Sequence, residues 1–159
     1  DFEEIVYEGY GPYGIGILIE CATDNPTRTV ANIRMYFNRG NGTLGKTGSL
    51  DFLFERKGVF KLKSDGLNVE DLELELIDFG AQDVYLNDEN EIIVETAFTD
   101  FGMMHKALEE KKFNVLSSEN MRVPHTQTEL TEEQSDEILQ LIEKIEADDD
   151  VQNVYHNLK

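Results

Sequence analysis

Apolar residues in the first part of the chain follow strand spacing and then helix spacing. A mostly β-branched apolar run after Gly14 indicates a buried strand, so we expect a strand region over 5–22 with a glycine-rich interruption. Val30, Ile33 and Phe37 share one face at helical spacing. A helix is therefore predicted to follow the start signal at 23–26 and to end near residue 38.

Leu50, Phe52 and Phe54 alternate with mainly polar residues, which is typical of a half-buried strand. This pattern predicts a strand over 49–55 and, after a short connection, a second strand over 58–63. The order over residues 1–63 is then strand, helix, strand, strand.

The middle of the chain, residues 64–126, has an α+β pattern of its own. Leu72 and Leu76 fit helical spacing and Gly80 suits a helix end, although Leu72, Leu74 and Leu76 also alternate as in a strand. The further elements expected here are a hairpin of 84–86 and 92–94, a helix over 101–108 and a strand over 120–123.

The end of the chain predicts a helix and a last strand. Thr131 and Gln134 form a capping box, and the apolar stripe that begins at Ile138 needs a sheet to cover it. Three aspartates at 148–150 end the helix as a solvated spacer or, alternatively, a cation-binding turn, and a strand over 151–155 follows.

Together these elements predict an α+β fold of two small ferredoxin-like or related α/β-sandwich lobes. The first lobe comprises 1–63 and 127–159 in the order βαββαβ, and the second lobe, 64–126, is inserted into it. Neither the first segment nor the tail alone covers both of its apolar faces.

Charge is distributed unevenly along this acidic protein of net charge −19. Residues 1–63 contain eight acidic and eight basic residues, whereas residues 64–159 contain 25 acidic and six basic ones. An anionic surface repels phosphate backbones, so contact with DNA or RNA is confined to the cationic stretch at 28–63. The candidate phosphate contacts are Arg28, Arg34, Arg39 and Lys46, and the alternative is that they are ordinary surface cations.

Two glycine clusters imitate nucleotide-binding motifs. Residues 9–14 fit G-x-G-x-x-G, and residues 40–47 fit the phosphate-loop pattern G-x-x-x-x-G-K-[ST]. Both motifs bind phosphate only where a strand leads through the loop into a helix N-terminus, and neither cluster is expected in that setting. We therefore expect loop glycines and no nucleotide cofactor.

Other features restrict the protein class. No apolar run is long enough for a membrane span, and the single Cys21 lies in an apolar strand, which favours a buried thiol in a reducing cytoplasm. The three histidines lack metal-ligand spacing and no nucleophile is paired with a base, so neither an enzyme nor a metal site is expected. The chain starts without Met, which suggests a processed or truncated product.

Several strings in the same order resemble the YebC/PmpR family over nearly the whole chain. They are residues 6–12 (VYEGYGP), 23–25 with Arg28 and Thr29, 45–49 (GKTGS) and 149–155 (DDVQNVY). The motif positions are Tyr7, Gly9, Tyr10, Gly11, Asp24, Asn25, Thr29, Gly45 and Gly48. Lys46 departs from the family, which usually has Glu there, so the phosphate-loop pattern is not a family feature.

The resemblance implies a bacterial cytoplasmic regulator of transcription, or a ribosome-associated translation factor, with an additional basic N-terminal helical domain that this chain lacks. That domain would make most of the contact with DNA, RNA or the ribosome, and this chain would add the cationic stretch. Tyr7, Tyr10 and Tyr13 would stack on bases or, alternatively, serve in packing. A second hypothesis is a module that senses a small molecule or assembles with itself.

Overall fold

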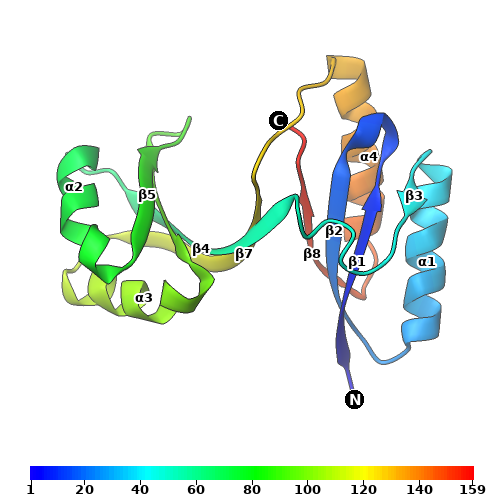
Figure 1. Cartoon of the computed structure of the whole chain (residues 1–159), viewed down its shortest axis with the longest axis horizontal. Coiled ribbons are helices and arrows are strands. Elements are labelled where there is room, and N and C mark those ends of the chain that lie inside the picture. Colours follow the sequence, from blue (N-terminus) through cyan, green and yellow to red (C-terminus); the bar gives the residue numbers. More distant parts are fainter. The chain divides into compact units, whose positions relative to one another are not determined.

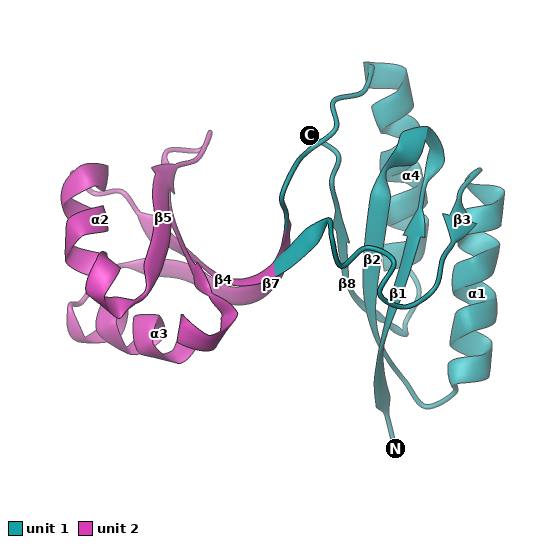
Figure 2. Cartoon of the chain, in the orientation of Figure 1, with its two compact units in different colours: residues 1–55, 124–159 teal, residues 56–123 magenta.

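The computed structural model describes all residues from Asp1 to Lys159. The chain divides into two compact units, unit 1 of residues 1–55 and 124–159 and unit 2 of residues 56–123 (Figure 2). Each unit combines one four-stranded sheet with two α-helices, which confirms the α+β class (Figure 1). None of the helices is both long and apolar enough to cross a bilayer.

Unit 1 has its strands in the order β3-β1-β2-β8, and every neighbouring pair is antiparallel. The strand region expected over 5–22 is a hairpin of two strands, because Gly11 to Gly14 turn the chain back, with Tyr13 at φ 64°. The elements of unit 1 are β1 (Glu3–Tyr10), the 3₁₀ turn Pro12–Gly14, β2 (Gly16–Thr23), α1 (Pro26–Arg39), β3 (Thr43–Leu44), α4 (Glu132–Glu146) and β8 (Val151–His156).

The predicted helix ends of unit 1 are present. The Asn25 side chain accepts a hydrogen bond from the backbone N–H of Arg28 at the start of α1. At the start of α4, Thr131 and Gln134 form the reciprocal capping box that the sequence indicated. Both helices therefore begin where side-chain acceptors satisfy free backbone N–H groups.

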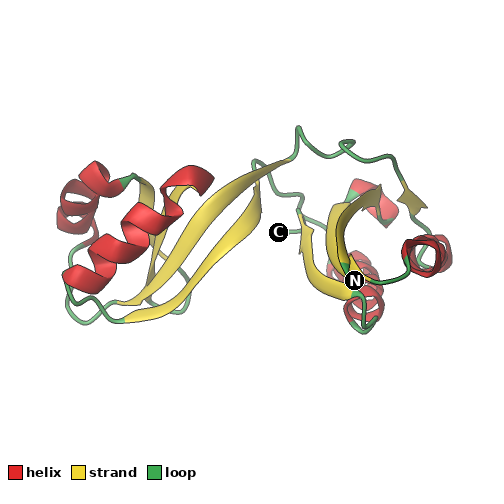
Figure 3. Ribbon diagram, turned by 90° about the horizontal axis from the view of Figure 1, so that it is seen from below, coloured by secondary structure: helices red, strands yellow, loops and turns green.

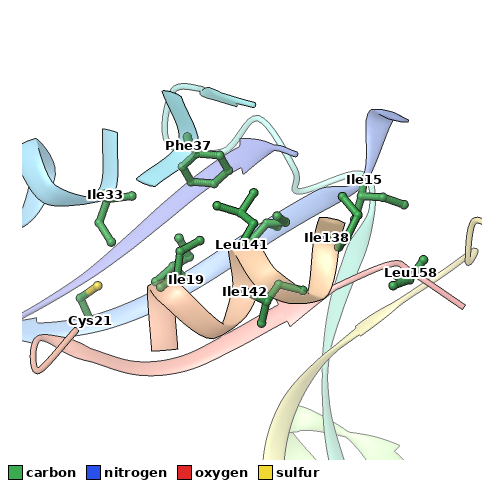
Figure 4. Close-up of a cluster of buried hydrophobic side chains, with 11 residues drawn as sticks. Ile15, Ile19, Cys21, Ile33, Phe37, Ile138, Leu141, Ile142 and Leu158 are labelled. Atoms are coloured by element: carbon green, nitrogen blue, oxygen red, sulfur yellow. The ribbon is translucent and has the colours of Figure 1, made fainter. Parts of the chain in front are cut away.

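Helices α1 and α4 bury their apolar sides against the sheet of unit 1. Figure 4 shows Ile33 and Phe37 of α1 and Leu141 and Ile142 of α4 in one buried cluster. Cys21 lies in the same cluster, where burial raises the pKa of its thiol to about 12, with further effects of Asp148 and Asp150. The expected buried thiol is confirmed, and it stays protonated at neutral pH.

The strand expected over 49–55 is absent before Phe54, because the segment 46–53 forms a series of turns. Backbone hydrogen bonds from Ser49 to Lys46, from Asp51 to Gly48 and from Leu53 to Leu50 close three successive turns. Leu50 is buried with Leu18 while Phe52 is 70% exposed, so the expected alternation does not describe a sheet face. The strand β4 starts later, at Phe54.

Unit 2 contains the βαββαβ order that the sequence analysis assigned to the first lobe. Its strands lie in the order β5-β6-β4-β7, which is the ferredoxin-like arrangement. Figure 3 distinguishes the helices of the chain in red from its strands in yellow. The elements are β4 (Phe54–Lys63), α2 (Val69–Leu76), the 3₁₀ turn Ile77–Phe79, β5 (Ala81–Leu86), β6 (Glu91–Ala97), the 3₁₀ turn Phe98–Asp100, α3 (Phe101–Glu110) and β7 (Val115–Pro124).

The boundary between the units differs from the predicted one because of β4. The sequence analysis placed 58–63 in the first lobe, but β4 pairs with β6 from Lys57 to Lys63 and so lies in the sheet of unit 2. Unit 2 accordingly starts at Arg56, and the order in unit 1 is ββαβαβ. The core of unit 2 is formed by Phe60 and Leu62 of β4 with residues of β5, β6, α2 and α3.

Candidate nucleic-acid interface

Arg28, the first candidate phosphate contact, is engaged by two carboxylates of its own chain. Its Nη2 lies 2.9 Å from Asp150 Oδ1 and 3.1 Å from Asp24 Oδ1, and its Nε donates to Asp150 Oδ2. The hydroxyl of Thr29 also donates to Asp150 Oδ2, at 2.8 Å. The hydrogen bonds from Arg28 and then Thr29 lower the pKa of Asp150 below its usual value.

This network gives the motif positions Asp24, Asn25 and Thr29 a structural role. They fix the start of α1 to the turn before β8, with Asn25 as the helix cap and Thr29 fully buried. Asp150 is buried too, so the three aspartates are neither a solvated spacer throughout nor a cation-binding turn. Arg28 already has carboxylate partners and is poorly placed to neutralise a phosphate.

The arginines of α1 do not share one face. Arg34 and Arg39 are five residues apart, which is about 140° around a helix, whereas Arg28 and Arg39 are only about 20° apart. Lys46 lies in the turns between β3 and β4. Arg28 and Arg39 moreover stand at opposite ends of α1, so the four sequence-predicted residues lie in separate places on unit 1. The cationic stretch 28–63 is also divided between the two units.

In unit 2 the cations of that stretch are occupied. Lys57 pairs with Glu95 at 3.2 Å, Lys61 with Glu91 at 3.6 Å and Lys63 with Asp65 at 4.0 Å. The guanidinium of Arg56 lies 3.9 Å from the ring centroid of Phe98. The three lysines thus have carboxylate partners, whereas Arg56 keeps its positive charge over an aromatic ring.

Arg39 differs from these paired cations, because it has no carboxylate partner and shares a hollow with a second cation of this kind. It lines a hollow of about 140 Å³ between α1 and α4, together with Lys144, Asn41 and Gln140. Neither Arg39 nor Lys144 takes part in an ion pair. We call this the Arg39–Lys144 hollow, and it brings two free cations and two amide side chains together.

One carboxylate, that of Glu137, also lines the Arg39–Lys144 hollow. The hydroxyl of Tyr13 donates to its Oε2 at 3.0 Å, which partly satisfies it. The sequence analysis missed Lys144 because it considered only the cationic first part of the chain. Its position three residues after Leu141 in the apolar stripe of α4 would have placed it beside α1.

The surface next to the Arg39–Lys144 hollow is acidic. A groove of about 640 Å³ is lined by Phe2, Asp24, Arg28, Asn32 and residues 147–150. Asp148 accepts hydrogen bonds from Tyr36 and Asn32. The acidic groove adjoins the Arg39–Lys144 hollow, since Tyr36, which lines the hollow, donates one of these hydrogen bonds to Asp148 of the groove. Of the two, only the hollow contains cations without a carboxylate partner and suits a polyanion.

The glycines of the family motifs hold backbone geometry and do not form a phosphate loop. A Cβ on Gly9 would lie 2.6 Å from the carbonyl oxygen of Thr43, and Gly48 has φ 88°. The buried carboxylate of Glu8 accepts hydrogen bonds from the N–H groups of Gly48 and Leu50, and Gly45 N–H donates to the Glu8 carbonyl. Glu8 was not singled out by the sequence analysis, since its partners are about 40 residues away.

The remaining motif residues lie on or just after β1. Tyr7 is half-buried against the core of unit 1, which supports packing over base stacking. Tyr10 and Tyr13 are exposed and remain accessible to a partner, whereas Gly11 is buried.

No group of three or more His, Cys, Asp or Glu side chains in the chain could hold a metal ion. A shallow hollow of about 270 Å³ in unit 2 is lined by Phe60, His105, Leu108, Glu109, Phe113 and Val115. Since Phe60 and Leu108 have no exposed surface, a small molecule there would contact mainly the rim.

Comparison with known proteins gives a consistent result over the whole chain. The family model described as the second and third domain of TACO1/YebC matches residues 2–158. A "probable transcriptional regulatory protein" of Cytophaga hutchinsonii is 62% identical over 158 residues, covering 99% of this chain and 66% of that protein. A protein of the same description from Parabacteroides distasonis is 53% identical over 160 residues, covering 100% of this chain and 65% of that protein.

The fold also matches a crystal structure. A conserved hypothetical protein from Aquifex aeolicus superimposes with a TM-score of 0.84 at 30% identity, covering 99% of this chain and 65% of the other. The chain thus spans about two thirds of the length of the proteins that it resembles.

Proposed function

The chain belongs to the TACO1/YebC family, and from this premise we propose that it is a non-catalytic regulator of gene expression that binds DNA, RNA or the ribosome. The relatives are named probable transcriptional regulatory proteins, which supports a role in regulation. Action on translation is part of the same proposal, because the ribosome presents the same phosphate chemistry as free RNA. We place this activity in the cytoplasm, where bacterial transcription and translation take place.

The observation that carries the proposal is the Arg39–Lys144 hollow. Two cations without ion pairs line the same hollow in a unit that contains 18 acidic and six basic residues. A carboxylate of the same chain would stabilise these two cations, yet neither of them forms an ion pair. Both cations therefore remain available to an external phosphate. Gln140 and Asn41 add neutral donors for phosphate or sugar oxygens.

The Arg39–Lys144 hollow positions and orients the chain on the nucleic acid and adds little to the binding affinity. The net charge of −19 repels a polyanion from the rest of the surface, so binding through the hollow alone is weak and sensitive to salt. We propose that Arg34 and Lys46 contact phosphates secondarily. Most of the cationic contact in the complete relatives then lies in the third of their length that this chain does not match.

The test is a salt series with fluorescently labelled duplex DNA, single-stranded RNA and purified ribosomes, at about 50 to 200 mM KCl. We expect the double substitution Arg39→Gln/Lys144→Gln to reduce the slope of log K against log[salt] by about two, because two phosphate contacts are lost. The strongest of the three ligands identifies the nucleic-acid partner.

The control is Lys106→Gln/Lys112→Gln in unit 2, which removes the same charge elsewhere. If this control lowers the slope as much as the hollow substitutions do, binding follows net charge and the assigned interface is wrong. The complete C. hutchinsonii relative should show a steeper slope than this chain. Equal slopes would contradict the assignment of the main contact to its remaining third.

A further inference from the structure

Unit 2 exposes two large aliphatic side chains at the end of α2. Leu74 is 73% exposed and Ile77 is 57% exposed, whereas Leu72 and Leu76 of the same helix are 3% and 0% exposed. Contiguous apolar surface with a polar rim is a candidate for a protein-binding surface. Neither Leu74 nor Ile77 belongs to the core of unit 2.

The two side chains are neighbours on the outer side of the helix. Leu74 lies about 200° around the helix from the buried Leu72 and therefore points away from the sheet. Ile77, three residues further in the 3₁₀ turn that continues α2, lies next to Leu74.

Carboxylates surround these two side chains. Glu70, Asp71, Glu73 and Asp78 are exposed, and none of them takes part in an ion pair. In contrast, Glu75 of the same helix pairs with Lys111 at 3.6 Å. We name Leu74, Ile77 and the four unpaired carboxylates the α2 ridge.

We propose that the α2 ridge binds a basic segment of a protein partner that presents apolar side chains together with Lys or Arg. The aliphatic pair supplies the apolar anchor and the carboxylates supply charge complementarity around it. Nucleic acid does not fit, because its phosphates would face the four carboxylates. This partner is a different one from the phosphate ligand of the Arg39–Lys144 hollow.

A second copy of this chain does not fit the α2 ridge either. A symmetric pair would place the same ridge on both sides, and its four carboxylates would face four others. The chain as a whole has a net charge of −19, which adds to the repulsion. The charge pattern therefore selects a cationic partner.

The probe is a short fluorescein-labelled synthetic peptide with Leu and Lys at helical spacing, and its binding to the 159-residue chain is followed by fluorescence anisotropy. We expect Leu74→Ala/Ile77→Ala to weaken binding at least about tenfold, because the apolar anchor is lost. Both side chains are exposed and alanine favours helix, so these substitutions leave the fold intact, which circular dichroism checks.

The matched control is Leu139→Ala on α4, an exposed leucine that also follows acidic residues but stands without an exposed aliphatic neighbour three or four positions away. Binding should be unchanged by Leu139→Ala and weakened by Glu70→Gln/Asp71→Asn, more so at low salt. Equal weakening by Leu139→Ala, no weakening by Leu74→Ala/Ile77→Ala, or self-association through the ridge in light scattering would each overturn the proposal.

Discussion

At the scale of single residues, the ion pairs decide which cations can serve a partner. Arg28 belongs to the family motif, yet Asp24 and Asp150 occupy its guanidinium. Arg39, outside the motif strings, has no such partner. In a strongly acidic chain carboxylates are abundant, so a cation that forms no ion pair is a candidate for contact with a partner.

Replacing Asp150 by Asn should destabilise unit 1 at neutral pH but not in acid. The folded state lowers the pKa of Asp150 below its ordinary value of 3.8. Its contribution is therefore fully present above about pH 4 and is lost as the pH falls through the lower folded value. Urea unfolding of the two proteins should differ at pH 7, and their midpoints should approach each other as the pH falls below 3.8 and through the lower folded value.

If the urea midpoint of Asp150→Asn equals that of the original protein at pH 7, the network with Arg28 and Thr29 does not stabilise unit 1. Lys61→Gln is a suitable control, since Lys61 pairs with Glu91 on the partly exposed sheet of unit 2. It should leave the pH dependence of unit 1 unchanged.

At the scale of elements, local signals predicted helices and strands better than they predicted the turns at 46–53. The capping box at Thr131 and the hairpin of β5 and β6 needed only short-range patterns, and both are present. The turns depend on Glu8, whose carboxylate is distant in sequence, so the alternation of Leu50, Phe52 and Phe54 indicated a strand. The same limit applies to Lys144, which lies beside Arg39 only once α1 and α4 pack.

Glu8→Ala should loosen the turns at 46–53 and destabilise unit 1 by about 2 to 4 kcal/mol, because two backbone N–H groups would lose a charged acceptor. Leu50 N–H, which donates to Glu8 at 2.9 Å in a buried site, should lose its protection from hydrogen exchange. Unchanged protection at Leu50 would contradict this role. Glu4→Ala, at an exposed position of the same strand, is the control.

At the scale of the whole molecule, two separate cores support two units. The apolar stripe of α4 belongs to unit 1, and Phe60, Leu72 and Leu76 belong to unit 2. The α+β class and the existence of a second α+β region were accessible from the periodicity. The boundary was not, because β4 continues without a break from Phe54 of unit 1 into unit 2.

Core truncations should therefore act on one unit at a time. Leu76→Ala should reduce hydrogen-exchange protection in residues 56–123, and Ile142→Ala should do so in 1–55 and 124–159, each by about 2 to 5 kcal/mol. Both residues are almost fully buried, so the comparison is balanced. Loss of protection throughout the chain after either substitution would show that the two units unfold as one cooperative block.

The hydrogen bond from His125 N–H to the Leu53 carbonyl, 2.9 Å long, joins the two places where the chain leaves and re-enters unit 1. With respect to unit 1, the segment between Leu53 and His125 is a loop whose two ends are held together by this hydrogen bond. The entropy of closing such a loop rises only logarithmically with its length, and a folded segment with neighbouring ends, such as β4 and β7 in one sheet, adds little further cost. Unit 1 can therefore tolerate segments of very different size and sequence at this junction, which makes it a natural point for exchanging one folded cassette for another.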